Sequence, residues 1–324
     1  MDNTLNQSNP ITLQKTMILF LIPIVFSSVV QSLGQVISTI VVGQTLGEES
    51  LAAISAFFPL FFFLFSFAIG IGSGSSILIG QTYGVGNISK MKEVVGVTLA
   101  LTLLISIVVA IFGWLFAEDI LRWMGTPNNI LVETTNYAEI LFITLPIIFL
   151  YMSYTTFIRG TRDSKTPLLF LIVSIVINVV FLPILMFGWF GLPAFGLNGA
   201  AYASVISNLL TFILMLLYLH KKNHELKLDK IILKNIRLKG DIVKTLLKLA
   251  IPSSIGMVAI AMAEIAVLTF VNSYGSDATA AYGIVNQIAS YIQIPGISVS
   301  IAISVFVAQA IGAGNQENLK KLQS

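Results

Sequence analysis

The chain has 324 residues, of which 56% are hydrophobic and only 10% are charged. Its mean hydropathy is +0.90, whereas soluble globular domains carry about 25% charged residues. A water-soluble fold could not cover this much apolar surface, so the composition excludes a soluble globular protein. The chain contains no cysteine, which excludes disulfide bonds.

Eight apolar stretches exceed the roughly 20 residues that a helix needs to cross about 30 Å of hydrocarbon. They run over Leu13–Val42, Leu51–Thr82, Val94–Phe116, Tyr137–Ile158, Pro167–Phe190, Gly199–Leu219, Ile242–Asn272 and Thr279–Ala310. Unpaired backbone groups are costly in lipid, and the runs lack the two-residue alternation of barrel strands. The sequence therefore predicts an all-α, polytopic integral membrane protein. Residues 1–16 lack the features of a signal peptide, so we expect the first span to remain in the mature chain.

The basic residues gather on one side of these spans. All 18 Lys and Arg residues except Arg122 lie in or near the loops of that side. The acidic residues of the opposite loops are Glu48, Glu49, Glu118, Asp119, Glu133 and Asp277. The positive-inside rule assigns the basic side to the cytoplasm and places the N-terminus there. This topology, with attraction to anionic membrane lipid, accounts for the net charge of +3, so no nucleic-acid partner is expected.

A polar, basic segment interrupts the spans at residues 221–240. Its Leu and Ile spacing fits a short helix lying on the inner membrane surface, and a solvated linker fits the composition equally well. We predict three parts: a six-helix N-terminal lobe over 1–220, a basic cytoplasmic linker over 221–240, and the start of a C-terminal lobe with two helices over 241–324.

The two parts flanking this linker share a repeated pattern. Gly47, Ala52, Ala53, Ser76, Gln81, Gly84, Gly86 and Asn87 recur as Gly275, Ala280, Ala281, Ser304, Gln309, Gly312, Gly314 and Asn315, all displaced by 228 residues. Pro23 and Pro252 correspond with one residue of slippage. Because six helices precede the second copy, both copies should share one orientation, related by an axis along the membrane normal.

The run from Phe157 to Ser207 resembles the signature region of the multidrug and toxic compound extrusion (MATE) transporters. The matching elements are Arg159-Gly160, Thr166-Pro167, Asn178, Pro183, Gly188, Gly196 and Gly199-Ala200-Ala201 with Ala203 and Ser207. Further matches are Val42-Gly43, Leu46-Gly47, Met124-Gly125, Tyr274-Gly275 and Ala280-Ala281-Tyr282-Gly283.

The resemblance implies twelve helices in two lobes and export of organic, often cationic, compounds against inward flow of protons or sodium ions. With eight spans, the chain is similar to a member that is incomplete at its carboxyl end. We expect a multi-pass protein of the plasma or inner membrane, surrounded by lipid, monomeric, and without a cofactor other than the coupling ion. Two competing interpretations are a lipid-linked precursor flippase of related architecture and a non-transporting fragment.

Glu264 is the acidic residue placed well inside a predicted span. Burying a carboxylate there costs at least about 2.5 kcal/mol unless it is protonated, paired or hydrated. An ion-coupling or cation-binding role is therefore the first hypothesis, and a structural hydrogen bond is the alternative. Many MATE relatives have Val-Asp-Thr where this chain has Ile37-Ser38-Thr39. Ser38 thus stands at an expected coupling position, but serine does not titrate near neutral pH, which adds weight to Glu264.

Polar side chains on other spans are candidates for substrate binding. The first span offers Gln31 and Gln35, which share a helix face with Ser28 and Ser38. The fifth span offers Asn178, and the eighth offers Tyr282, Asn286 and Gln293. Tyr and Gln can contact a flat cation by cation–π attraction and hydrogen bonding. Hydrogen bonding between neighbouring helices is the competing interpretation for each residue.

Gly70 and Gly74, one helical turn apart in the second span, predict a close helix–helix contact. No strand precedes these glycines and no Gly-Lys-Ser/Thr follows, so they are not a phosphate-binding loop. The chain shows no nucleophile motif, no clustered metal ligands and no cofactor fingerprint. We therefore expect a protein that is not an enzyme.

Overall fold

A computed structural model describes residues 10–272 and 276–315, and over these residues it is helical without a strand. Eight helices are long and apolar enough to cross a membrane, which confirms the predicted all-α membrane fold. The long helices are α1 Pro10–Leu46, α2 Glu48–Gly84, α3 Ile88–Leu115, α5 Asn128–Gly160, α6 Lys165–Phe187, α7 Leu197–Lys221, α9 Gly240–Asn272 and α10 Ser276–Gly312. The short elements are α4 Ala117–Trp123, the 3-10 turn η2 Trp189–Gly191 and α8 Lys230–Lys234.

Local sequence signals set several helix ends. The side chain of Asn87 accepts a hydrogen bond from the backbone N–H of Lys90 at the start of α3, and Asp229 caps α8 in the same way. These caps satisfy backbone donors that the first helical turn leaves unpaired. Gly188 adopts a left-handed conformation (φ 71°) immediately after α6, where glycine carries no Cβ penalty.

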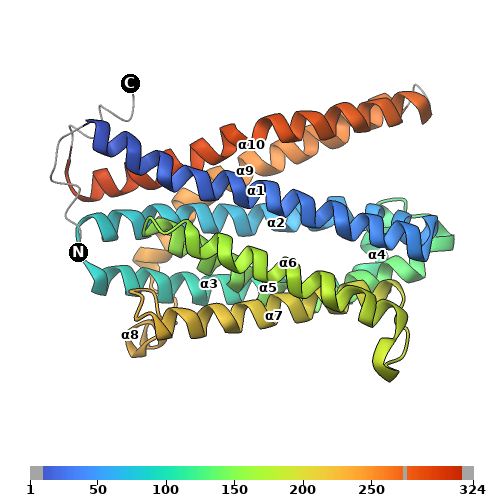
Figure 1. The fold of residues 1–324 in the computed structure, drawn as a ribbon, viewed down its shortest axis with the longest axis horizontal. Coiled ribbons are helices and arrows are strands. Elements are labelled where there is room, and N and C mark those ends of the chain that lie inside the picture. Colours follow the sequence, from blue (N-terminus) through green and yellow to red (C-terminus); the bar gives the residue numbers. More distant parts are fainter. Residues whose placement is uncertain (1–9, 273–275, 316–324) are drawn as a thin grey trace.

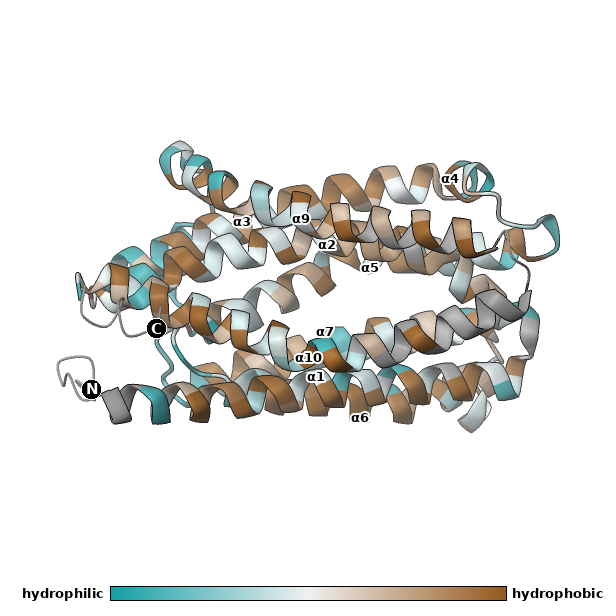
Figure 2. Ribbon diagram, turned by 90° about the horizontal axis from the view of Figure 1, so that it is seen from above, coloured by the Kyte–Doolittle hydropathy of each residue, from teal (hydrophilic) through white to brown (hydrophobic). Residues whose placement is uncertain are grey.

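The helices form two layers (Figure 2). One layer holds α2, α3, α5 and α9, and the other holds α1, α6, α7 and α10. Contacts of α2 with α10 and of α5 with α7 join the layers. The second-lobe helices α9 and α10 thus lie one in each layer, each beside a helix of the first lobe.

The two ends of the bundle differ in charge. We call the end that holds the α2–α3 turn, the α5–α6 turn and α8 the basic end, because Lys90, Lys92, Arg162 and Lys165 lie there. The other end, which we call the distal end, holds α4 and the first turns of α5. Figure 1 places α8 and α4 at opposite ends of the long axis.

The linker after α7 packs against the protein instead of lying free in solvent. The side chains of Leu226 and Ile232 are fully buried in a cluster with α3, α5 and α7. Lys92 of α3 forms an ion pair with Asp229, and Lys239 forms one with Glu93. Apolar and charged groups of the segment thus both anchor it to α3. Its position on the membrane surface stays a prediction. The division of the chain into two lobes stays a prediction.

Candidate functional site

Helix α2 meets α9 through its small residues. A Cβ atom added to Gly70 would lie 1.8 Å from Ser254 Oγ and 2.9 Å from Ala250 O. One added to Gly74 would lie 3.1 Å from Leu246 O. These distances leave no room for a larger side chain, so the predicted close helix contact at Gly70 and Gly74 is confirmed, with α9 as the partner.

Nearer the basic end, α2 meets α10 through a reciprocal pair of contacts. A Cβ atom on Gly84 would lie 2.3 Å from Gln309 O, and one on Gly312 would lie 2.1 Å from Gln81 O. Gln81 and Gly84 are the repeat equivalents of Gln309 and Gly312. The repeat therefore exchanges the two contacts: Gly84 meets Gln309, and its equivalent Gly312 meets Gln81, as a two-fold relation between repeats produces.

Gln309 adds a buried hydrogen bond to this contact. Its buried amide Nε2 donates a 2.7 Å hydrogen bond to the backbone oxygen of Gly160, the last residue of α5. The sequence offers one signal for this role, the repeated Gln-x-x-Gly-x-Gly-Asn ending. Gln309 thus ties the second-lobe helix α10 to two first-lobe helices at the basic end.

Helix α1 packs against α10 at the same end. The rings of Phe20 and Phe306 meet edge to face with centroids 5.7 Å apart, and Ile24 is buried beside Ala302. Figure 1 shows α10 close to α1 here and farther from it toward the distal end. The described contact of α1 with α10 therefore has its buried apolar cluster at the basic end.

Toward the distal end, α9 and α10 present large apolar side chains to the outside. Ile260, Met262 and Val267 of α9 are 54%, 65% and 46% exposed, and Ile292 of α10 is 73% exposed. The side chains of Ala250, Ser254, Ser298 and Ala302, nearer the basic end, are buried. Among the described side chains, the buried small residues of α9 and α10 thus lie toward the basic end, and α10 diverges from α1 toward the distal end (Figure 1).

Four predicted site residues belong to the region where this splaying begins. Gln31 and Gln35 are exposed on α1, Ser38 is half-buried on the same helix, and Gln293 is exposed on α10. Helices α1 and α10 run antiparallel, with Phe20 opposite Phe306. At equal rise per residue, Gln31 and Gln35 flank the level of Gln293. The polar groups of the two helices therefore lie at one depth.

The remaining candidates on the second lobe lie in helices whose backbone is described. Glu264 belongs to α9, and Tyr282 and Asn286 belong to α10, but their side chains lie outside the described part of the structure. Glu264 follows Pro252 by twelve residues, as Gln35 follows Pro23. Counted from these prolines, Gln35 is the first-span counterpart of Glu264, whereas the 228-residue offset of the other repeat positions gives Val36.

Asn178 lies between α6 and α7. Its amide Nδ2 donates to Ser204 Oγ at 3.4 Å, and Asn208 Nδ2 donates to Ser204 O at 2.8 Å. The hydroxyls of Ser174 and Ser207 lie 3.2 Å apart in the same row. This contact matches the interhelical role that the sequence left open for Asn178, and its role in substrate binding stays a prediction. No group of His, Cys, Asp or Glu side chains able to hold a metal ion occurs among the described residues.

A polytopic helical bundle whose last two helices repeat the first two, and pack closely on α2 within the described residues, has the build of a two-lobed membrane transporter. Comparison with known proteins identifies the family. The MatE family model matches residues 23–184 and 252–323, so the chain belongs to the MATE family. Its members are membrane transporters and not enzymes.

Individual relatives agree with this assignment. The chain is 51% identical over 319 residues to the probable multidrug resistance protein YoeA of Bacillus subtilis, covering 98% of this chain and 69% of that protein. It is 27% identical to a FAD transporter of Shewanella oneidensis, covering 85% of this chain and 60% of that protein. A solved structure of a MOP superfamily transporter from Pyrococcus furiosus superposes with a TM-score of 0.84 at 25% identity, covering 95% of this chain and 66% of that one. The chain thus spans roughly two thirds of the length of these proteins.

Proposed function

We propose that the protein is a secondary-active antiporter that exports organic, cationic drugs or toxic compounds in exchange for protons or sodium ions by alternating access. The observation that carries this proposal is the inequality of the two ends of the lobe contact. Tight packing of α2 with α9 and α10 closes the basic end, while α1 and α10 diverge toward the distal end (Figure 1). A transporter needs two such states, one open to each side of the membrane.

The basic end faces the cytoplasm in this proposal. The positive-inside rule supports this orientation, because Arg122 on α4 is the one basic residue of the distal end. The present structure then corresponds to the outward-open state. Because the chain has no cysteine, single cysteines at Ser89 and Trp123 test the orientation directly. A membrane-impermeant maleimide added to intact cells should label Trp123→Cys and spare Ser89→Cys; the reverse pattern would overturn the orientation.

Glu264 carries the ion coupling in this proposal. An acid at mid-span is stabilised in its neutral form by low dielectric, so it can take up a proton in one state and release it in the other. Coupling requires that the ion favours one state, since a ligand that binds both states equally shifts neither. Ser38 cannot supply this charge change, so it serves at most as a neutral oxygen ligand near the first-lobe polar row.

Gln31, Gln35, Gln293, Asn178, Tyr282 and Asn286 supply the substrate contacts in this proposal. Amide oxygens and a tyrosine ring suit an organic cation without requiring a fixed charge from the protein. The common depth of Gln31, Gln35 and Gln293 supports a shared surface reached from the distal end. The protein acts as a monomer within the cell membrane.

The test is uphill export of a fluorescent organic cation from proteoliposomes under an imposed pH or sodium gradient. Glu264→Gln should reduce gradient-driven export by about tenfold or more, because the neutral amide cannot exchange the ion. Glu139→Gln on α5 is the matched control and should retain export. Undiminished export by Glu264→Gln would remove the coupling role.

The same assay separates the competing functions. A passive channel cannot move the cation uphill, and an inert fragment moves none in either direction. Binding of a lipid-linked pyrophosphate without cation export would instead favour the flippase.

A further inference from the structure

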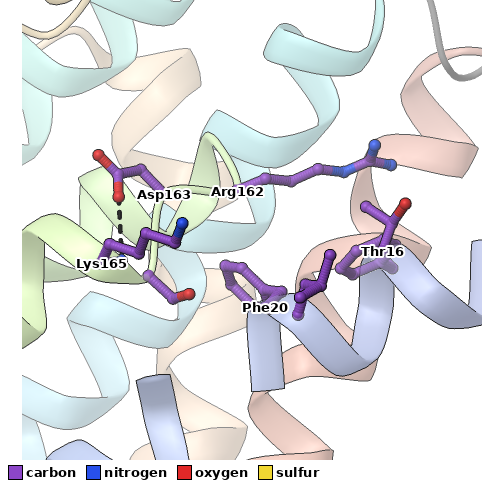
Figure 3. A pocket seen from close by; sticks show the side chains of 8 residues that line it. Thr16, Phe20, Arg162, Asp163 and Lys165 are labelled. Carbon is purple, nitrogen blue, oxygen red and sulfur yellow. Dashed lines mark hydrogen bonds between the residues drawn. The ribbon is translucent and has the colours of Figure 1, made fainter. Parts of the chain in front are cut away.

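A pocket of about 270 Å³ opens at the basic end. Its wall comes from the first turns of α1, from the α5–α6 turn and from α10. The lining residues are Thr16, Leu19, Phe20, Arg162, Asp163, Ser164, Lys165 and Phe306. Figure 3 shows the Arg162 side chain reaching away from Asp163, toward the part of the pocket that Thr16 lines. The pocket lies apart from the polar row of Gln31, Gln35 and Gln293.

Arg162 occupies a conformation that is unfavourable for its type. Its φ is 65°, in the left-handed region where a residue with a Cβ is disfavoured by roughly 1 kcal/mol relative to glycine. Backbone strain of this kind persists where the surroundings require it. Here it directs the guanidinium across the lobe contact to stack 4.4 Å above the ring centroid of Phe306.

The positive charge of Arg162 is only partly satisfied. Its Nε is buried and donates to no acceptor in the described part of the chain, and no carboxylate of the described residues lies within ion-pair distance. Burial lowers the pKa of Arg162 to about 10, against a smaller opposing effect of Tyr83. The side chain therefore remains charged at neutral pH and can take an anion as a further partner.

The acid in the pocket wall is already engaged. Asp163 accepts hydrogen bonds from the backbone N–H groups of Lys165 and Thr166 and from the Thr166 hydroxyl. Its other neighbour is His224 of the linker, at 3.9 Å. Arg162 and Lys165 thus leave the pocket with a net positive charge.

The depth of the pocket identifies the source of the anion. It lies where the apolar stretch of α5 ends at Gly160 and that of α6 begins at Lys165, and we expect lipid headgroups at the ends of such spans. Beside it, Ile18, Leu19 and Ile22 of α1 are each more than half exposed and continue the apolar surface along the span. A phosphate in the pocket and acyl chains on this surface match a phospholipid.

We propose that this pocket binds the phosphate group of an anionic phospholipid, with Arg162 and Lys165 as its ligands. Because Arg162 belongs to the first lobe and Phe306 to α10, the bound lipid joins the lobes at their closed end. It therefore binds the packed state more tightly than a state in which α10 moves away from the α5–α6 turn. This inference does not depend on transport.

The test is a binding titration of the purified protein in detergent micelles, with native mass spectrometry as the readout. The three probes are dioleoylphosphatidylglycerol, dioleoylphosphatidylcholine and inorganic phosphate. Phosphatidylglycerol should bind more tightly than phosphatidylcholine, and inorganic phosphate should not displace it. Displacement of the lipid by inorganic phosphate at equal concentration would make a soluble anion the ligand and overturn the lipid assignment.

Arg162→Gly is the decisive variant, because glycine accepts the left-handed backbone and the fold is expected to persist. It should weaken phosphatidylglycerol binding about tenfold, the loss of one charge-assisted hydrogen-bonding partner. Arg162→Lys keeps the charge and should lose less. Arg237→Gly removes an exposed arginine of the same end and should leave binding within about twofold, as for other surface charges. An equal loss of lipid binding in Arg162→Gly and Arg237→Gly, or no loss in either, would overturn the assignment of this pocket as the lipid site.

Discussion

The two halves of α9 and α10 differ in how their small residues pack. Near the basic end, Ala250, Ser254 and Ala302 are buried against the first six helices, while large apolar side chains such as Ile255 and Ile292 are exposed in both halves. The difference follows from the partner surface, because Gly70, Gly74 and Gly84 line α2 only where contact is made. In lipid, apolar surface alone does not drive helices together, and close backbone approach does. The positions of the glycines on α2 therefore decide which half of α9 and of α10 packs closely against it.

The first way to break this contrast is Gly312→Ala. The new methyl group would meet Gln81 O at 2.1 Å, and overpacking of this kind costs about 1–3 kcal/mol. Gly296→Ala on the same helix is the matched control, since its Cβ meets no described atom within 4 Å and should be neutral or stabilising. Thermal unfolding in micelles measures both. Equal melting temperatures for the two variants would show that the α2–α10 contact carries little stability.

A smaller loss is expected from Gln309→Leu. It removes the 2.7 Å hydrogen bond to Gly160 O and leaves a buried acceptor unpaired, at a cost of about 1–3 kcal/mol before the gain from the added apolar surface. Gln293→Leu places the same change on an exposed position of α10 and should change stability little. Chemical unfolding monitored by tryptophan fluorescence distinguishes them. Greater destabilisation by Gln293→Leu would contradict the assignment of the closed end.

Asp229→Asn should loosen the attachment of the linker to α3 at the basic end. Burial opposes ionisation of Asp229, but the hydrogen bond from Lys92 and the amides of Ile232 and Ile231 outweigh it, so its pKa is lowered. A lowered folded-state pKa contributes stability above the ordinary aspartate range, and this is lost as pH falls through the folded value. Asparagine caps a helix as well as aspartate does, so only the Lys92 pair is lost, worth about 1 kcal/mol.

Thermal unfolding across pH checks this prediction. Asp229→Asn should lie below the parent protein near neutral pH and converge with it in acid, once the parent carboxylate is protonated. A difference in melting temperature between the two proteins that stays constant with pH would mean that the ion pair contributes nothing to stability.

The smallest effect is expected at the distal end. Arg122 pairs with Glu118 on α4, and both side chains are more than half exposed. Exposed pairs of this kind are nearly neutral, so Arg122→Gln should change unfolding free energy by less than about 0.5 kcal/mol. Denaturant titration provides the measurement. A loss matching that of Gln309→Leu would remove the proposed difference between the ends.

Much of this architecture is predictable from the sequence, because lipid imposes simple rules. The eight spans follow from length and hydropathy, and a close helix contact follows from Gly70 and Gly74, although the partner helix α9 does not. The short helix α4 is too brief and too polar to show in a hydropathy pattern. The packing of Leu226 and Ile232 under α3 depends on where the chain folds back, which no local pattern contains.

The site is less predictable than the fold. Polar residues such as Gln31 and Asn178 stand out in apolar spans, but a span pattern does not distinguish a residue that bonds a neighbouring helix from one that faces a substrate. Asn178 lies against Ser204, and Gln31 is exposed. Arg162 gives no signal in the sequence, because its left-handed backbone and its stacking on Phe306 arise only when both lobes are assembled.

The central claim is that one end of the lobe contact opens as the other closes. Double electron–electron resonance on spin labels tests it most directly, with one pair at Ser89 and Lys244 near the basic end and another at Val132 and Val267 near the distal end. All four side chains are exposed. On changing the pH or adding a transported cation, the account predicts that one distance lengthens while the other shortens. Two distances that move together, or neither moving, would contradict it.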